Sequence, residues 1–439
     1  MLNDEITNLR SYNSLATVLK EDVLLDLQVS DVLRALYRKR AMLLYDTGMG
    51  KTIMATAWMK MLLNEDPNRK FLFIAKYQQL AQTPEKIERN LGYSVCATNA
   101  EKESLERIFY SGEFKNYKVF IITHNCLGNL KFMQTLFKFR NEYFGIIVDE
   151  AHNLSNSNYA SSASMLKSML SCYEYVLALT ATPIVSNIDQ LAKLANVIDG
   201  DTYDNARKLI NDLKAGRFSL NNDPNFFISR TREDFGINLE IKGHVINVDP
   251  SSHQVGATGQ ELFLITKGDG AFNQVNRLVK FIKDKEGERG LIYINQHAIR
   301  EWVIPFLDKN NVKYECINGY TSMAERKEIL EKFNVEHEID VIITSVTEAL
   351  DLDCNWVMFY EFTVNIAQMI GRATRGFEDR CLDVYFMVTD LTDEVDYFNN
   401  HIYNVAKDIL RTTGKKYTAV YDAHEQLLDV DDDDWSWED

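Results

Sequence analysis

Residues 43–52 read LLYDTGMGKT, an apolar run that passes into a glycine-rich turn ending in Gly50, Lys51 and Thr52. The backbone N–H groups of such a turn cradle phosphates, while the lysine neutralises phosphate charge and the threonine hydroxyl ligates Mg²⁺. Residues 145–152 read GIIVDEAH, a second apolar run that ends in the adjacent carboxylates Asp149 and Glu150. One carboxylate can hold Mg²⁺ through water and the other can orient the attacking water. Together the two motifs indicate hydrolysis of a nucleoside triphosphate.

Composition and charge set broad limits on this chain. Its 439 residues are enough for two or three domains, and 46% hydrophobic with 26% charged residues is an ordinary globular balance. The formal net charge is −16. Residues 417–439 hold nine carboxylates and no Lys or Arg, so the remainder carries −16 + 9 = −7. A nucleic-acid partner would therefore need a local basic surface.

The cysteines and the hydropathy pattern argue against several classes of protein. The six cysteines are scattered and form no CxxC pair, which disfavours structural zinc and a disulfide scaffold and suits a reducing cytosol. The polar, acidic start of the chain shows no signal peptide, and no apolar run approaches membrane-spanning length. We therefore expect a cytoplasmic protein without a membrane partner.

Short apolar runs fall into two sets, each typical of strands buried on both faces of a parallel sheet. The first set is 42–45, 71–75, 119–123, 145–148 and 175–179, and the second is 291–295, 314–318, 340–344, 356–362 and 382–388. Two sets predict two doubly wound α/β domains, with a break somewhere in 200–285.

The domain prediction follows from these runs. We expect a first domain at 1–200 with an N-terminal helical extension, and a linker with a small accessory insertion at 201–285. A second domain is expected at 286–420 and an acidic, disordered tail at 421–439. Within the linker, residues 217–230 have strong turn residues between apolar ends and predict a β-hairpin. Packing is the favoured role of this hairpin, and its Phe226 and Phe227 keep a strand-separating wedge as the alternative.

The motifs of this chain resemble those of superfamily 2 helicases and translocases, from about residue 20 to residue 390. The matching segments, in the family's order, are 25–28, 47–52, 74–76, 122–125, 149–152, 179–183, 291–296, 317–322 with Arg326, 344–351 and 368–375. The resemblance implies two tandem RecA-like domains with an ATP site in the cleft between them, and ATP with Mg²⁺ as cofactors.

The resemblance also implies roles for individual residues. Catalytic roles fall to Lys51, Asp149, Glu150, Gln368, Arg372 and Arg375, and Mg²⁺ binding to Thr52 and Asp149. Nucleotide contacts fall to Gln28, Thr47, Gly48, Met49, Gly50, Lys51, Thr52 and Asp351. The coupling of the γ-phosphate to the nucleic-acid groove is assigned to His152, Thr180 and Thr182. Nucleic-acid contacts fall to Lys76, Thr123, Asn125, Arg230, Asn295 and Thr344.

Plainer interpretations stand beside several of these roles. Gln28 can be an ordinary residue of a helix surface, and Lys76, Thr123 and Asn125 can be solvated loop residues. Arg230 can pair with a neighbouring carboxylate such as Glu233 or Asp234. Thr344 can simply cap the end of a strand.

Within the superfamily, residues 226–234 resemble Swi2/Snf2-type DNA translocases, whereas the QxxGRxxR pattern at 368–375 resembles DEAH-type and phage helicases. Ala349 and Tyr45 depart from the usual family residues. The chain is most similar to compact bacteriophage helicases that act on forked and branched DNA. This likeness implies a bacterial or infected-host cytoplasm and a role in DNA replication or recombination.

The sequence thus favours an ATP-dependent motor on nucleic acid, with DNA favoured over RNA. Two alternatives remain open: a DEAH-type RNA helicase, and a nucleotide-gated clamp or assembly factor that scarcely moves. The tail at 429–439 is either a solvated solubility tail or a peptide that imitates nucleic acid. In the second case it would cover the protein's own basic groove or dock onto a protein partner.

Overall fold

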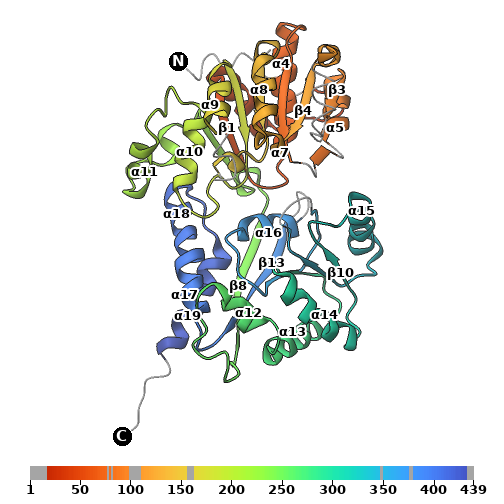
Figure 1. Cartoon of the computed structure of the whole chain (residues 1–439), viewed down its shortest axis with the longest axis vertical. Coiled ribbons are helices and arrows are strands. Elements are labelled where there is room, and N and C mark those ends of the chain that lie inside the picture. Colours follow the sequence, from red (N-terminus) through yellow and green to blue (C-terminus); the bar gives the residue numbers. More distant parts are fainter. Residues whose placement is uncertain are drawn as a thin grey trace. The chain divides into compact units, whose positions relative to one another are not determined.

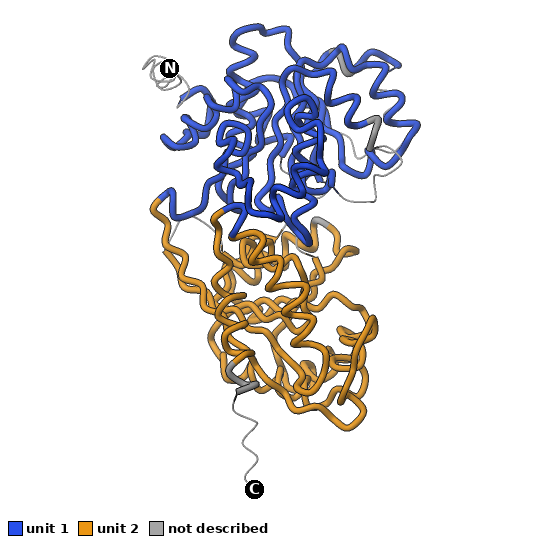
Figure 2. Tube along the Cα trace, turned by 90° about the vertical axis from the view of Figure 1, so that its left-hand side faces the viewer, with its two compact units in different colours: residues 1–235, 411–413 blue, residues 236–410, 414–439 orange. Residues whose placement is uncertain are grey.

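The structure is a computed structural model that describes residues 17–76, 79–80, 83–97, 110–155, 163–346, 350–374 and 379–432. The chain divides into two compact units (Figure 2): unit 1 comprises residues 1–235 and 411–413, and unit 2 comprises residues 236–410 and 414–439. The division falls inside the predicted break. The stretch 201–285 is shared between the two units and does not form a unit of its own.

Unit 1 is built on a seven-stranded sheet in which every pairing is parallel, in the order β3-β4-β2-β5-β6-β1-β7. Its strands are β1 (Arg40–Tyr45), β2 (Phe71–Ala75), β3 (Val95–Ala97), β4 (Val119–Thr123), β5 (Gly145–Val148), β6 (Tyr175–Leu179) and β7 (Phe227–Arg230). The five predicted strands are confirmed. Residues of β2, β4 and β5 are buried throughout, as their unbroken apolar sequences require.

Helices of unit 1 precede the first of these parallel strands or connect one strand to the next (Figure 1). They are α3 (Asp26–Arg38), α4 (Lys51–Glu65), α5 (Thr83–Leu91), α7 (His124–Leu127), α8 (Leu130–Lys138), α9 (Ala163–Ser171), α10 (Asp189–Ile198) and α11 (Ala206–Lys214). Short 3-10 turns are η2 (Glu113–Asn116), η3 (Arg140–Glu142), η4 (Ala151–Ser155), η6 (Leu220–Asn222) and η7 (Glu233–Phe235). Strand and helix alternate along the chain, which gives the doubly wound architecture expected of parallel strands.

The predicted β-hairpin at 217–230 is wrong. Its first half contains only the single turn η6, and its second half is β7, which runs parallel to β1 with Met42 opposite Phe227. Phe226 and Phe227 are 0% and 2% exposed, and their rings pack against that of Tyr203. These two aromatic residues therefore belong to the core of unit 1, which also removes the wedge interpretation.

Unit 2 contains a six-stranded sheet, again with parallel pairings only, in the order β10-β11-β9-β12-β13-β8. Its strands are β8 (Leu239–Val248), β9 (Gly290–Tyr293), β10 (Tyr314–Ile317), β11 (Val341–Thr344), β12 (Trp356–Phe359) and β13 (Arg380–Thr389). The five predicted strands are confirmed, and β8 is additional. Only part of β8 is buried, because it lies at the sheet edge, and its sequence LEIKGHVINV is correspondingly interrupted by polar residues.

The helices of unit 2 are α12 (Leu262–Lys267), α13 (Phe272–Asp284), α14 (His297–Lys309), α15 (Met323–Glu331), α16 (Ile366–Ala373), α17 (Glu394–Tyr397), α18 (Asn404–Thr413), of which residues 411–413 are assigned to unit 1, and α19 (Thr418–Asp432). A 3-10 turn, η8 (Gly259–Glu261), and two π-type turns, η9 (Lys332–Glu336) and η10 (Phe398–Tyr403), complete it. No described helix is long and apolar enough to cross a membrane.

Helix α19 corrects the prediction of a disordered tail at 421–439, because residues up to Asp432 are helical. The helix covers the edge strand β8. Asp422 accepts a hydrogen bond from the Gly243 backbone N–H at 3.0 Å, and the Gln426 side-chain amide donates to the Gly243 carbonyl at 2.8 Å. A Cβ at Gly243 would lie 2.0 Å from the Ala419 carbonyl oxygen, so only glycine permits this approach. Residues 433–439 of the predicted tail lie outside the described residues.

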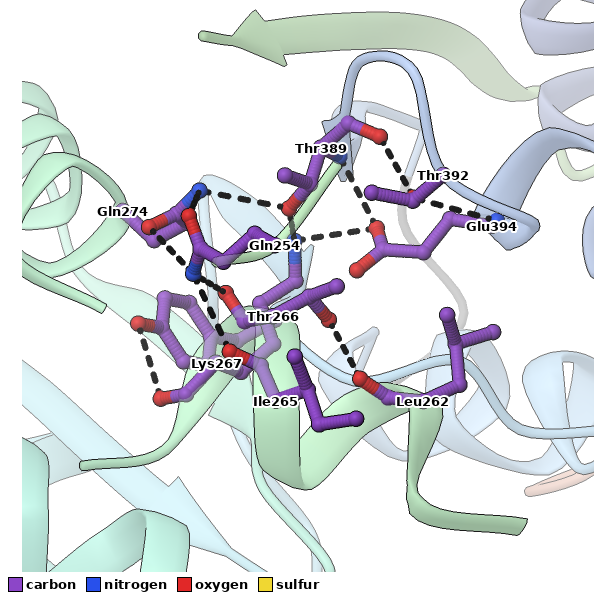
Figure 3. A network of polar contacts seen from close by, with 10 residues as sticks. Gln254, Leu262, Ile265, Thr266, Lys267, Gln274, Thr389, Thr392 and Glu394 are labelled. Carbon is purple, nitrogen blue, oxygen red and sulfur yellow. Dashed lines mark hydrogen bonds and ion pairs between the residues drawn. The ribbon is translucent and has the colours of Figure 1, made fainter. Parts of the chain in front are cut away.

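A buried polar network joins three elements of unit 2 (Figure 3). The Lys267 ammonium at the end of α12 donates to Thr389 Oγ1 at 2.9 Å and to Glu394 Oε2 at 3.0 Å. The same Glu394 oxygen accepts a hydrogen bond from the Thr389 backbone N–H at 2.9 Å. Both charged side chains are 0% exposed. Burial lowers the pKa of Lys267, whereas Glu394 favours its charged form. The pair thus ties α12 to α17 and to the end of β13.

Candidate active site

The turn between β1 and α4 has the geometry of a phosphate-binding loop. Gly48 and Gly50 have φ angles of +83° and +76°, a region that side chains rarely tolerate. The N-terminus of α4 begins directly after Gly50, so its unpaired N–H groups and its dipole favour an anion. The Lys51 ammonium donates to the carbonyl oxygens of Tyr45 at 2.9 Å and Asp46 at 3.1 Å. The lysine is therefore held at the loop, where a phosphate would meet it.

Gln28 lies under this loop and is 4% exposed, which rules out the interpretation as a helix-surface residue. Its side-chain oxygen accepts from the Leu25 backbone N–H at 2.9 Å, at the start of α3. Its side-chain nitrogen donates to the Met49 carbonyl at 3.1 Å, and a Cβ at Gly50 would lie 2.9 Å from that nitrogen. Gln28 thus connects α3 to the phosphate loop.

The carboxylate pair follows β5 at the carboxyl edge of the same sheet. Asp149 is 3% exposed and accepts hydrogen bonds from the Gln79 side-chain nitrogen and the Glu150 backbone N–H, both at 2.9 Å. Burial, and then the neighbouring Glu150, raise the pKa of Asp149 to about 6, while nearby Lys51 lowers it. Glu150 has a φ of +46°, an uncommon conformation for a residue other than glycine.

The three predicted coupling residues lie together next to this pair. His152 Nδ1 lies 3.0 Å from Thr180 Oγ1 and 3.5 Å from a Glu150 carboxylate oxygen. The Thr182 backbone N–H donates to Thr180 Oγ1 at 3.1 Å. All three residues are buried. A continuous chain of short contacts therefore runs from the carboxylate pair to the turn that follows β6.

Two further residues support Asp149: Gln79 lies outside the matching segments, and His124 lies within 122–125 but was assigned no role. His124 Nε2 lies 2.6 Å from the Asp149 carbonyl oxygen, so this nitrogen must be the donor. Burial lowers the pKa of His124 to about 4, which keeps its ring neutral. Gln79 accepts from the Lys76 backbone N–H at 2.9 Å, and its other side-chain atom donates to Asp149. Gln79 orients the carboxylate that is predicted to bind Mg²⁺, and His124 holds the backbone from which that carboxylate projects.

Arg232 is a third residue that the sequence analysis missed. It follows β7, is 5% exposed, and donates from Nη2 to the Thr47 carbonyl at 3.3 Å. Its backbone N–H donates to an Asp46 carboxylate oxygen at 3.2 Å. The segment 226–234, which resembles Swi2/Snf2 translocases, therefore contacts the phosphate loop through Arg232. The place of Arg232 within that segment is the signal from which its role could have been predicted.

Three predicted nucleic-acid residues use their polar groups within the protein. Arg230 forms two hydrogen bonds with buried Asp31, at 2.7 Å and 3.0 Å, and this favours a structural role. Thr344 is 0% exposed and donates to the Ile317 carbonyl at 3.0 Å, as a strand-end cap does. Thr123 is also buried, with its hydroxyl 3.2 Å from a cysteine sulfur. The plainer interpretation is favoured for Arg230, with Asp31 as its partner instead of Glu233 or Asp234, and for Thr344. Thr123 is no solvated loop residue, because it is buried at the end of β4.

The other three predicted nucleic-acid residues remain accessible. Asn125 and Asn295 are exposed, and Lys76 is partly exposed. Each follows the carboxyl end of a parallel strand, which is where ligands of such sheets bind. These three keep their predicted role as a proposal.

In unit 2, Gln368 and Arg372 lie on α16, while Arg375 lies outside the described residues. Arg372 Nη1 is 3.8 Å from a carboxylate oxygen of Asp351, whose side chain is 69% exposed. The Arg372 carbonyl accepts from the Leu352 backbone N–H at 2.9 Å. Unit 2 thus brings together Arg372 and Asp351 from two predicted motifs.

The residues of unit 1 fit a nucleotide with its Mg²⁺. Gly48 and Gly50 have the positive φ angles of a phosphate-binding turn, and Lys51 supplies a cation. Asp149 is a buried carboxylate close to Lys51. Among the described residues no group of three or more His, Cys, Asp or Glu gathers as for a protein-only metal site. Mg²⁺ commonly takes only one or two protein ligands and completes its shell with water and phosphate. Thr52 and Asp149 suffice for that arrangement.

Comparison with known proteins agrees with this geometry. Residues 13–185 match the family model described as type III restriction enzyme, res subunit, and residues 273–377 match the helicase conserved C-terminal domain. Protein L538 of Acanthamoeba polyphaga mimivirus, which bears the name of an ATP-dependent RNA helicase, is 40% identical over 342 residues. That match covers 64% of this chain and 76% of L538.

Two further similarities are more distant. Helicase SWR1 of Mycosarcoma maydis is 26% identical over 162 residues, 35% of this chain and 9% of that protein. The solved SWI2/SNF2 ATPase core of Sulfolobus solfataricus in complex with double-stranded DNA is 17% identical, with a TM-score of 0.42, over 92% of this chain and 96% of that one.

The chain belongs to the superfamily 2 helicases, which are ATP-hydrolysing, nucleic-acid-dependent enzymes. Its two parallel-sheet α/β units are the two domains of this family.

Proposed function

We propose that this protein is an ATP-dependent motor that remodels or unwinds duplex, forked or branched DNA. The observation that carries the proposal is the chain of contacts from Glu150 through His152 to Thr180 and Thr182. A hydrolytic site alone needs no such link. Its presence supports a protein in which the state of the γ-phosphate is passed on to another part of the molecule.

The proposed chemistry assigns one task to each residue of unit 1. Lys51 binds the β- and γ-phosphates, and Thr52 and Asp149 hold Mg²⁺, which neutralises charge on those phosphates. Glu150 orients the attacking water. His124 and Gln79 keep Asp149 in position, and they do so without contacting the nucleotide.

Unit 2 supplies the remaining groups in this proposal. Arg372 and Arg375 stabilise the charge of the transferring phosphoryl group once the two units close on ATP, an effect worth roughly 10³–10⁵ in rate for such arginines. Closure then depends on ATP and opening depends on hydrolysis, which makes the cycle a stepping device. Gln368 lies one helical turn from Arg372 on α16 and is assigned to the same site.

The choice of DNA rests on residues 226–234, which resemble Swi2/Snf2 DNA translocases and which place Arg232 against the phosphate loop. An RNA helicase is the second candidate, because the relative L538 carries that name. The two candidates share every residue of the hydrolytic site, so only the substrate distinguishes them.

The test is a comparison of ATP hydrolysis with double-stranded DNA, forked DNA, single-stranded DNA and RNA. The parent should be stimulated strongly by its track. Lys51→Ala should abolish turnover and weaken nucleotide binding, whereas Glu150→Gln should retain bound ATP and lose turnover. Lys138→Ala, an exposed lysine of α8, is the matched control and should behave as the parent.

Two results would contradict the proposal. If Lys51→Ala hydrolysed ATP as fast as the parent, the hydrolytic site would not lie at this loop. Slow turnover with all four nucleic acids would instead identify a nucleotide-gated clamp. Strand displacement on a fork, set beside triplex displacement on duplex, then separates an unwinding enzyme from a translocase.

A further inference from the structure

The loop that joins β10 to α15, two elements labelled in Figure 1, carries an unusually exposed aromatic side chain. Tyr320 is 98% exposed, more than any other large apolar side chain among the described residues. The neighbouring Gly319 has open space where a Cβ would project. Both faces of the Tyr320 ring are therefore accessible to a ligand.

The backbone that carries this ring is held in place. The Tyr320 backbone N–H donates to the Asn318 side chain at 2.8 Å, and the Asn318 backbone N–H donates to the Thr321 hydroxyl at 3.0 Å. Arg326, which is 4% exposed, donates to the Asn318 carbonyl at 2.8 Å and to the Thr321 carbonyl at 3.1 Å. The buried Arg326 side chain thus holds a short loop in place, and the exposed Tyr320 lies at the tip of that loop.

Rigidity of this kind matters for binding, because a side chain on a fixed backbone loses little conformational entropy when it contacts a ligand. A tyrosine that served only as a solvated loop residue would need no such support. The combination of exposure and fixation therefore indicates a contact surface.

The loop also lies at the edge of the sheet where ligands of parallel sheets bind. Strand β10 ends at Ile317, whose carbonyl accepts from Thr344 at the end of the adjacent β11. The next strand, β9, leads to the exposed Asn295. Tyr320 is therefore on the same carboxyl edge of the unit 2 sheet as Asn295, which keeps its predicted role in nucleic-acid contact.

The charged residues near Tyr320 indicate which part of a nucleic acid, phosphate or base, this loop would contact. Residues 314–325 contain no Lys or Arg, and they include Glu315 and Glu325. The tip of the loop, residues 318–322, therefore offers an aromatic ring and no Lys or Arg, while buried Arg326 already donates to its carbonyls. An unpaired base offers an uncharged π-face, and stacking on an aromatic ring is tolerant of sequence.

We propose that Tyr320 is a stacking platform for an unpaired base of single-stranded nucleic acid. The inference rests on the proposed motor function and deepens it: the motor holds at least one nucleotide of its track by the base, in addition to backbone contacts. Paired bases within a duplex are not available to this ring.

The test is equilibrium binding of labelled oligonucleotides at one fixed salt concentration, measured by fluorescence anisotropy. The ligands are single-stranded oligo-dT, single-stranded oligo-rU, a blunt DNA duplex, and an abasic single strand of the same length. The proteins are the parent, Tyr320→Ala, Tyr320→Phe, and Tyr37→Ala as a control on an exposed tyrosine of α3 in unit 1. Thermal unfolding of each variant reports on folding.

Stacking contributes about 1–3 kcal/mol per base, so Tyr320→Ala should weaken binding of the preferred single strand by about 5- to 150-fold. Tyr320→Phe should bind as the parent does, and Tyr37→Ala should be silent. The parent and Tyr320→Ala should bind the abasic strand equally. Loss with oligo-dT identifies DNA as the source of the base, and loss with oligo-rU identifies RNA.

Equal affinity of Tyr320→Ala and the parent for both single strands would overturn the inference, as would an equal loss on the abasic strand or on the duplex. A parent that binds no nucleic acid and shows no stimulated hydrolysis would instead overturn the proposed function itself. The two failures are therefore distinguishable.

Discussion

Replacement of Lys267 by methionine should destabilise unit 2 strongly. The side chains of Lys267 and Glu394 are both 0% exposed, and their charged atoms lie 3.0 Å apart. At an effective dielectric constant of about 20, two unit charges at that distance attract by about 5.5 kcal/mol. The variant keeps the hydrogen bond from the Thr389 backbone to Glu394 but leaves the carboxylate without its cation. Removal of one partner from a buried pair typically costs about 3–5 kcal/mol.

The double variant Lys267→Met with Glu394→Gln provides the matched comparison. It removes both charges and retains an oxygen that can accept the Thr389 N–H, so its loss should be much smaller, about 1 kcal/mol. Urea unfolding of the full chain gives the stability, and hydrogen exchange of residues 380–389 reports on unit 2 alone. Parent-like unfolding of Lys267→Met, or a double variant as unstable as the sum of the two single variants, would refute the reasoning.

Three further results are expected. Because the pKa of Asp149 is about 6 in the fold and about 3.9 in an unfolded chain, this carboxyl should contribute a loss of stability as pH rises between these values; Asp390, whose pKa is also raised to about 6, contributes in the same direction, so in thermal scans of the metal-free protein Asp149→Asn should make the slope shallower without abolishing it. Thr180→Val removes the contact with His152 and should lower nucleic-acid-stimulated turnover about tenfold with little change in ATP affinity; an equal loss of affinity would argue against coupling. Arg230→Ala should destabilise unit 1 by about 2 kcal/mol, because it removes two hydrogen bonds to the buried Asp31 carboxylate, which keeps Arg34 and Tyr45 as partners, and it should leave the salt dependence of DNA binding unchanged; a shallower salt slope would restore its role as a phosphate contact.

The central strands of both sheets were predictable because burial on two faces requires unbroken apolar sequence. Residues 71–75 and 119–123 are strands over the full predicted lengths. Edge strands are less completely buried and need no unbroken apolar sequence. Strand β8, in which Lys242 and His244 alternate with other residues, therefore has no apolar run that could be detected. The pair Phe226 and Phe227 was assigned to a hairpin because the sequence contains no sign that β7 pairs with β1, nearly 200 residues earlier.

The residues proposed for hydrolysis could be picked out from the sequence for a different reason. A phosphate loop and a strand-end carboxylate pair impose local residue types, so Lys51 and Asp149 are visible in short windows. Their supports are not: Gln79, His124 and Arg232 reach the site across 25 to 186 positions of sequence. Polar residues at strand ends are ambiguous for the same reason, since only the fold shows that Thr344 caps its neighbour.

Strand β8 has a practical consequence for anyone who wishes to produce the second domain by itself. A gene fragment that starts at residue 286, where the apolar runs begin, would omit β8, α12 and Lys267 together. Ten backbone positions of β13 would lose their ladder partner, α19 would lose the strand that it covers, and Glu394 would remain in an apolar interior without its lysine. Such a fragment should aggregate through its open edge. Cloning from residue 236 keeps the sheet closed on that side and is the better starting point for expression.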